Sequence, residues 1–161
     1  MISLGLEDKV IFVSGGSRGI GAATVSLLQQ LGAKVAFTYR PVNSYYEGDL
    51  PEGALPIAAD VTDRAGMELA AKITEEKLGP VYGIVANAGI TKDNFYSKLT
   101  DDDWDKVINV NLKGVNHTIK PFINGMYERQ EGSIVCVSSF QERKVILVKR
   151  TTQPRKRRLS G

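Results

Sequence analysis

The sequence predicts a doubly wound α/β fold, in which helices cover both faces of a parallel sheet of five strands. Short apolar runs rich in β-branched residues alternate with segments of helical periodicity, which is typical of parallel sheets with right-handed crossovers. A glycine cluster also separates the first run from the first helical segment. The predicted strands are 10–13, 34–39, 55–59, 82–86 and 133–138.

The first strand and helix are the most clearly marked. The run Val10–Val13 is continuously apolar, as expected for a strand covered on both faces. It ends in the cluster Ser14–Gly21, after which a helical period begins. Gly32 follows the helix where a glycine commonly terminates one. The predicted apolar stripe of this helix consists of Ile20, Val25, Leu27, Leu28 and Leu31.

The segment 41–54 contains two prolines and two glycines, so we expect mostly loop there. Helices are predicted over 64–78 and 101–127. Thr100 precedes three aspartates and is expected to cap the second of these helices. Asn111 lies on the stripe that Trp104, Ile108 and Leu112 form, so its amide should face the core and find partners there. We expect Trp104 in the core and His117 on the surface.

Composition indicates an ordinary globular domain, with 42% hydrophobic and 24% charged residues. No apolar run approaches the roughly 18 residues of a membrane span, and no secretory pattern opens the chain, so we expect a cytoplasmic protein. The single cysteine, Cys136, lies in an apolar run and is predicted to be buried. No disulfide is possible, and no metal site is expected.

Charge is distributed unevenly. Residues 1–139 contain 13 Lys and Arg against 17 Asp and Glu, whereas residues 140–161 contain 8 Lys and Arg against one Glu. Such a step in composition indicates segments of different origin.

The glycines of the cluster are spaced as Gly15-x-x-x-Gly19-x-Gly21 between a strand and a helix. Glycines permit a tight turn and close backbone approach, while the helix N-terminus offers N–H groups and positive dipole to a pyrophosphate. The cluster therefore predicts a dinucleotide site, although a glycine pattern alone also fits a purely structural turn.

The second strand ends in Tyr39-Arg40, where an acidic residue would accept the ribose 2′-hydroxyl and an arginine would pair with a 2′-phosphate. Arg18, inside the glycine cluster, adds a second positive charge to the same region. Either arginine alone could be a solvated surface residue. Together they favour NADPH over NADH.

Further motifs occur in a fixed order along the chain. They are Ser14–Gly21, Asp60-Val61, Asn87–Asp93, Trp104, Asn109–Leu112 and Gly132–Ser139. In this order and spacing they resemble the short-chain dehydrogenase/reductase family, and within it the β-ketoacyl-acyl-carrier-protein reductases and acetoacetyl-CoA reductases. The resemblance covers about residues 7–139 and implies a Rossmann fold.

The resemblance implies that Asp60 and Val61 flank the adenine, that Asn87 to Gly89 brace the central strand, and that Asn111 and Ser139 are catalytic. The implied substrate is a 3-oxoacyl thioester of acyl-carrier protein or coenzyme A, and family members form homo-oligomers. The expected cofactor-binding residues are Ser14, Gly15, Ser17, Arg18, Gly19, Ile20, Gly21, Tyr39, Arg40, Asp60, Val61, Asn87, Ala88 and Gly89.

The chain departs from the family after Ser139. The family places a tyrosine, which gives a proton to the carbonyl oxygen, thirteen residues after the serine and a lysine four beyond it. This sequence has no tyrosine after Tyr127. Synonymous codons for 145–161 can, however, be chosen so that another frame reads Asn-Phe-Gly-Gln-Thr-Asn-Tyr-Ala-Ala-Ser-Lys-Ala-Ala-Leu-Ile-Gly. We therefore interpret 1–139 as a family domain and hypothesise a one-base deletion near Phe140 that puts 140–161 out of frame.

Three functions follow as hypotheses. The first is NADPH-dependent reduction of a 3-oxoacyl thioester by the intact gene product, with the chain as printed inactive for lack of the tyrosine and lysine. The second is a non-catalytic fragment that binds NADPH or a partner protein. The third, nucleic-acid binding through Arg155-Lys-Arg-Arg158, is disfavoured because a shifted frame produces such runs without selection.

Overall fold

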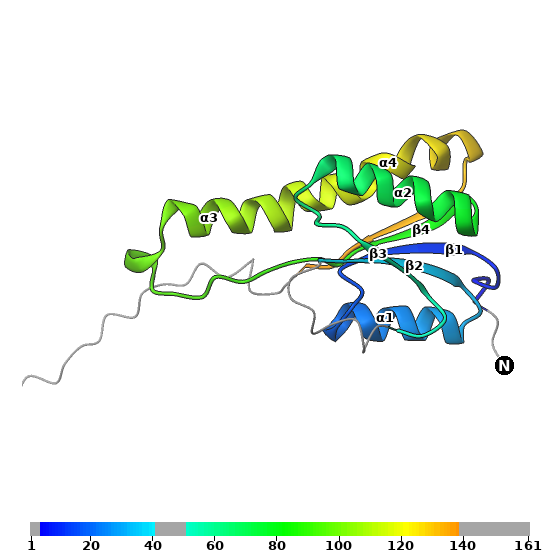
Figure 1. Cartoon of the computed structure of the whole chain (residues 1–161), viewed down its shortest axis with the longest axis horizontal. Helices are drawn as coiled ribbons and strands as arrows, with labels where there is room; N and C mark the ends of the chain where they lie inside the picture. The colour runs from blue at the N-terminus through cyan, green and yellow to red at the C-terminus, as the bar shows by residue number, and fades with distance from the viewer. Residues whose placement is uncertain (1–3, 41–50, 139–161) are drawn as a thin grey trace, which may run out of the picture.

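The computed structural model describes residues 4–40 and 51–138. Within them, five parallel strands form one sheet in the order β3-β2-β1-β4-β5 (Figure 1). The strands are β1 (Val10–Ser14), β2 (Lys34–Tyr39), β3 (Leu55–Ala58), β4 (Val81–Ala86) and β5 (Ser133–Cys136). The predicted fold class and all five predicted strands are confirmed, with boundaries shifted by at most two residues.

Helices cover both faces of the sheet, as the doubly wound fold requires (Figure 1). Helix α1 (Gly19–Gln30) lies on one face, and α2 (Arg64–Leu78) packs beside α4 (Gly114–Arg129) on the other. Strand β1, in the middle of the sheet, is buried along its whole length. Phe12 points toward α4 and contacts the Phe122 ring at 4.8 Å between centroids, while Val13 belongs to the cluster with Val25 of α1. Alternate residues of β1 therefore build two separate cores.

The predicted helix over 101–127 is continuous but not uniform. It comprises α3 (Asp101–Ile108), a π-helical turn over Asn109–Lys113, and α4, which ends at Arg129. A short 3₁₀ turn, Tyr96–Lys98, precedes it. None of the helices in the part of the chain that the structure describes is long and apolar enough to span a bilayer.

The predicted burial of two apolar stripes, one on α1 and one on the helix that begins at Asp101, is wrong in part. Trp104 is 61% exposed, because α3 projects beyond the strand ends and, among the described residues, no strand lies beneath it (Figure 1). Leu112, in the π-helical turn, is also exposed. In α1, Val25 is buried as predicted, but Ile20 and Leu27 face solvent. Helical periodicity identifies a face of a helix, whereas burial depends on what covers that face.

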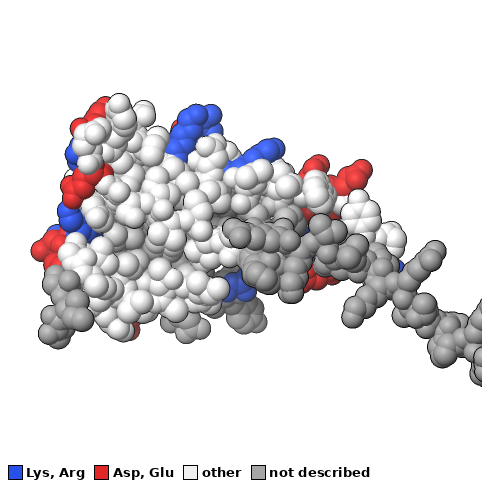
Figure 2. Space-filling model, turned by 180° about the vertical axis from the view of Figure 1, so that it is seen from behind, with Lys and Arg blue, Asp and Glu red and all other residues white. Residues whose placement is uncertain are grey.

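Cys136 is exposed, which contradicts its predicted burial. All four residues of β5 are exposed, because β5 is an edge strand and, among the described residues, nothing pairs with its outer side. Ile134, Val135 and Val137 therefore present apolar side chains to solvent. Figure 2 shows the molecule from behind, and few charged side chains lie in the middle of that view.

We expect this edge to promote self-association, because exposed apolar edge strands template further pairing. Replacing Val135, which is 52% exposed, by Lys should raise the soluble fraction of the expressed protein without lowering its melting temperature. Soluble yield and light scattering measure the effect. Val35→Lys, at a buried position of β2, should instead prevent folding. An unchanged soluble fraction for Val135→Lys would contradict the prediction.

Candidate functional site

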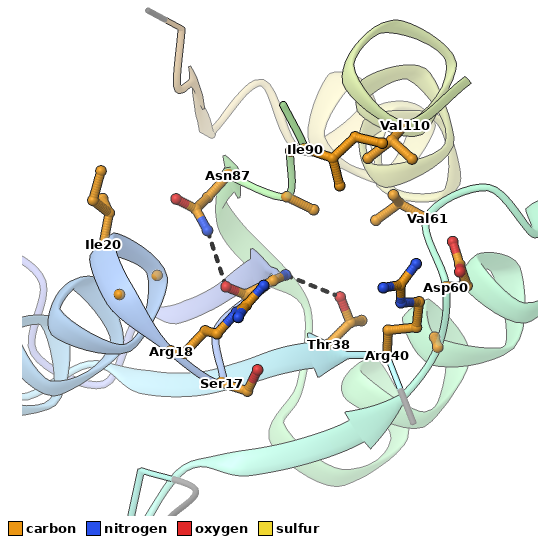
Figure 3. A pocket seen from close by; sticks show the side chains of 16 residues that line it. Ser17, Arg18, Ile20, Thr38, Arg40, Asp60, Val61, Asn87, Ile90 and Val110 are labelled. Carbon is orange, nitrogen blue, oxygen red and sulfur yellow. Dashed lines mark hydrogen bonds between the residues drawn. The ribbon is translucent and has the colours of Figure 1, made fainter. Parts of the chain in front are cut away.

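A cavity of about 770 Å³ opens at the carboxyl ends of the strands, where open α/β sheets bind ligands (Figure 3). The glycine loop, the end of β2, the segment after β3 and the segment after β4 surround it. Its lining residues are Gly15, Ser17, Arg18, Gly19, Ile20, Gly21, Thr38, Arg40, Ala59, Asp60, Val61, Asn87, Ala88, Gly89, Ile90 and Val110. Residues far apart in the sequence thus converge on one site.

Twelve of the fourteen expected cofactor-binding residues line this cavity, and Ser14 and Tyr39 do not. Ser14 is 1% exposed and is the last residue of β1. Tyr39 packs with Phe37 against the core on the α1 side, because alternate side chains of a strand point to opposite faces. The expected catalytic Ser139 lies outside the described residues.

Gly15 and Gly21 of the glycine loop leave no room for a side chain. Gly15 has φ +70°, and a Cβ there would lie 3.0 Å from the Ala88 Cα. A Cβ on Gly21 would lie 2.1 Å from the Gly15 carbonyl oxygen. Gly19 also has positive φ, but its Cβ direction meets no atom within 4 Å. The glycines therefore bring the backbone close together beneath an open space, as a phosphate-binding turn requires.

Asn87 braces this loop from the β4 side. Its side-chain amide donates to the carbonyl oxygens of Ser14 and Gly15, at 3.1 and 3.0 Å. In return, the Ser14 hydroxyl oxygen accepts from the backbone N–H groups of Asn87 and Ala88. Ser14 therefore acts as a buried link between β1 and β4 and does not line the cavity.

Thr38 is a site residue that the sequence reasoning missed. Its hydroxyl oxygen accepts from the Gly15 N–H at 3.3 Å, and its carbonyl oxygen accepts from the Gly16 N–H at 2.9 Å. The available signal was a polar residue between the apolar run Val35–Phe37 and Tyr39. Thr38 is 1% exposed, so its hydroxyl needs such a partner.

The two arginines approach the cavity from different elements (Figure 3). Arg18 comes from the glycine loop and Arg40 from the residue after β2. Both are exposed, and within the described residues no ion pair engages Arg40. Asp60 also lines the cavity, and its carboxylate accepts from the backbone N–H and the hydroxyl of Thr62. The cavity lining therefore includes two guanidinium groups and a carboxylate that is engaged by its own turn.

Asn111 has hydrogen-bond partners, as its predicted inward orientation requires. Its side-chain oxygen accepts from the Ile90 N–H and its side-chain nitrogen donates to the Ile90 carbonyl, both at 2.9 Å. The π-helical turn that contains Asn111 brings it to this backbone. His117, predicted at the surface, is instead half-buried, and its Nδ1 donates to the Val61 carbonyl at 2.8 Å. Both contacts tie the long helix to the cavity rim.

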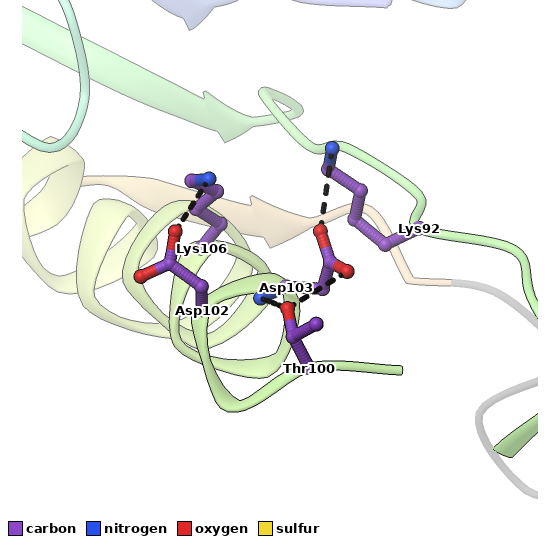
Figure 4. Close-up of polar contacts among 5 residues, drawn as sticks. All are labelled: Lys92, Thr100, Asp102, Asp103 and Lys106. Carbon is purple, nitrogen blue, oxygen red and sulfur yellow. Dashed lines mark hydrogen bonds and ion pairs between the residues drawn. The ribbon is translucent and has the colours of Figure 1, made fainter. Parts of the chain in front are cut away.

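The N-terminus of α3 is fixed as predicted, with the Thr100 hydroxyl oxygen accepting from the Asp103 N–H at 3.1 Å (Figure 4). The Asp103 carboxylate accepts from the same hydroxyl and forms an ion pair with Lys92 at 3.5 Å. The hydrogen bond from Thr100, followed by the charge of Lys92, lowers the pKa of Asp103 below its ordinary value of 3.8. This cluster links the loop after β4 to the helix that carries Asn111.

We expect a measurable pH dependence from Asp103. Because its pKa is lower in the folded state, its stabilising contribution is present above the unfolded value of 3.8 and is lost as the pH falls through the folded pKa. The stability difference between the wild type and Asp103→Asn should therefore shrink from about pH 6 to about pH 2.5. Urea unfolding at several pH values measures it. Asp101→Asn controls for helix-terminal charge, and a pH-independent difference for Asp103→Asn would contradict the prediction.

The family model of short chain dehydrogenases matches residues 9–149. The chain belongs to this family. Among relatives of this short-chain dehydrogenase, an acetoacetyl-CoA reductase of Synechocystis is 64% identical over 139 residues. A 3-oxoacyl-[acyl-carrier-protein] reductase, FabG, of Vibrio harveyi is 36% identical over 141 residues. These alignments cover 86% and 84% of this chain, but only 56% and 57% of the relatives.

Solved structures agree with the fold of this short-chain dehydrogenase. A short-chain dehydrogenase/reductase of Serratia marcescens superposes with a TM-score of 0.75 and 31% identity, over 88% of this chain and 60% of that one. A short-chain dehydrogenase structure from Novosphingobium aromaticivorans gives 0.73 and 29%, over 83% and 53%. The chain therefore spans little more than half the length of the relatives that it matches.

Proposed function

We propose that this chain is the NADPH-binding portion of a reductase that converts 3-oxoacyl thioesters to 3-hydroxyacyl thioesters. The observation that carries the proposal is one cavity in which a glycine turn, the N-terminus of α1 and two arginines face the same space. The residues of 1–139 form this portion. We further propose that residues 140–161 are translated from a shifted reading frame.

The cavity suits the adenosine and pyrophosphate parts of the cofactor. The first turn of α1 contains no acidic residue and has no side-chain cap, so its N–H groups and positive dipole are available to a pyrophosphate. Arg18 and Arg40 would pair with the 2′-phosphate, which favours NADPH over NADH. Val61 and Asp60 would flank the adenine. When bound, the cofactor supplies the hydride that reduces the substrate carbonyl.

The substrate class rests on the relatives named acetoacetyl-CoA reductase and FabG. We propose a 3-oxoacyl thioester of coenzyme A or acyl-carrier protein, acted on in the cytoplasm by a homo-oligomer of the intact gene product. Ser139 would donate a hydrogen bond to the substrate carbonyl. Asn111, through the Ile90 backbone, would hold the rim of the cavity and support a proton-relay water.

A second function is favoured by the sequence after Ser139, which lacks a Tyr-x-x-x-Lys. The printed chain would then bind NADPH, or a partner protein, without reducing a substrate. A general acid is worth about 10²–10⁴ in rate, so its loss leaves binding without useful turnover.

Titration of NADPH into the purified chain, followed by nicotinamide fluorescence, tests the proposal. We expect saturable binding that is tighter than NADH binding. Because Arg40 contributes a charged contact to the 2′-phosphate, Arg40→Ser should weaken NADPH by about tenfold while leaving NADH unchanged. Arg64→Ser, an arginine on α2 paired with Glu68, is the matched control and should alter neither. Absence of binding, or equal affinities of the wild type for NADPH and NADH, would overturn the proposed cofactor.

A further inference from the structure

Two consecutive amides of the glycine loop donate to a single residue of β2. The Gly15 N–H donates to the Thr38 hydroxyl oxygen (Figure 3). The Gly16 N–H donates to the Thr38 carbonyl oxygen. The carbonyl contact needs no particular side chain, since any residue at this position offers it. The hydroxyl contact is specific to a residue with a side-chain acceptor at this position.

The loop is thus held from two sides. Asn87 holds the Ser14 and Gly15 carbonyl groups from the β4 side, while Thr38 holds the Gly15 and Gly16 N–H groups from the β2 side. Gly15 has φ +70°, and both sets of contacts meet at its peptide groups. The orientation of the following turn, which opens into α1, depends on these peptide planes.

We propose that Thr38 is a positioning residue for dinucleotide binding, whose hydroxyl fixes the Gly15 amide and so presets the glycine turn to receive a pyrophosphate. The inference rests on the proposed function for its ligand, but the hydrogen bond on which it depends exists without one. Thr38 acts through Gly15, so its effect is the same for any dinucleotide, whether or not it carries a 2′-phosphate.

The substitution that isolates the hydroxyl is Thr38→Val. Valine keeps the branched shape but replaces the acceptor by a methyl group, which leaves the Gly15 N–H without its partner in a nearly buried place. Thr38→Ser keeps the hydroxyl and removes the methyl group, so it separates hydrogen bonding from packing. If the valine variant does not fold, Thr38→Cys, whose thiol is a weaker acceptor, replaces it.

Thr74→Val provides a matched control. Thr74 is also fully buried, and its hydroxyl donates to the Ala70 carbonyl within α2, outside the residues that line the cavity. Its removal deletes a buried threonine hydroxyl without affecting the glycine loop. Circular dichroism and thermal melting establish that every variant compared is folded.

Two measurements test the inference. Amide hydrogen exchange of residues 14–21, without ligand, should be at least about tenfold faster in Thr38→Val than in the wild type, Thr38→Ser and Thr74→Val. Dissociation constants for NADPH and NADH should both rise by about tenfold in Thr38→Val and stay near wild type in the two other variants. With Thr38→Cys, both effects should be intermediate. Unchanged exchange in Thr38→Val, a serine variant as impaired as the valine variant, or a loss confined to NADPH would overturn it.

The two proposals fail differently. If the wild type binds neither dinucleotide, the proposed function is wrong, yet the exchange measurement still decides whether Thr38 holds the loop. If the wild type binds NADPH and Thr38→Val binds it equally well, only the inference on Thr38 is wrong.

Discussion

Acetoacetyl-CoA should not be reduced measurably by the chain as printed, whereas the product of the restored reading frame should reduce it. The restored product is made by inserting one base at the Phe140 codon, so that the frame containing Tyr-x-x-x-Lys is read. A positioned general acid contributes about 10²–10⁴ to rate, and the lysine that seats the nicotinamide adds to this. The rate of NADPH oxidation, followed by absorbance, should therefore differ between the two proteins by at least about two orders of magnitude.

The control for this comparison is the restored chain with its new tyrosine replaced by phenylalanine. This variant has the full reading frame but lacks the general acid, so its rate should fall back toward that of the printed chain. Resequencing the gene tests the frame directly. The hypothesis of a one-base deletion would be contradicted if this chain turned over substrate as fast as the restored product. It would also be contradicted if the resequenced gene continued in the present frame and no frame encoded a Tyr-x-x-x-Lys.

Gly21→Ala should abolish NADPH binding, with a loss of at least about a hundredfold in affinity. The new Cβ would lie 2.1 Å from the Gly15 carbonyl oxygen and 2.6 Å from the Asn87 side-chain nitrogen. The first of these atoms belongs to the backbone, so the glycine turn itself must move. Titration with NADPH measures the loss, and thermal melting measures the accompanying destabilisation.

Gly66→Ala is the matched control, because Gly66 is the third residue of α2 as Gly21 is of α1. A Cβ on Gly66 meets the end of the Asp63 side chain at 2.8 Å, which can rotate away. Alanine is also the better helix former, by about 1 kcal/mol, so this variant should be as stable as the wild type or more stable. Retention of NADPH affinity in Gly21→Ala would show that the glycine turn does not hold the cofactor.

The sequence by itself determined the order of elements and the place of the site. Strands buried on both faces are continuous apolar runs, and the glycine cluster between a strand and a helix, together with the motifs that follow it, indicated the site, so local patterns sufficed. The same patterns predicted the Thr100 cap and the inward amide of Asn111, because caps and buried polar groups follow from short-range spacing.

Only the tertiary structure decided burial at the edges of the fold and the contacts across strands. Cys136 and Trp104 lie on apolar patterns yet are exposed, because β5 is an edge strand and α3 extends past the sheet. Thr38 meets Gly15 only because β2 and β1 pair in parallel with a fixed register. Periodicity reports which residues share a face, whereas the neighbours of that face come from parts of the chain far away in sequence.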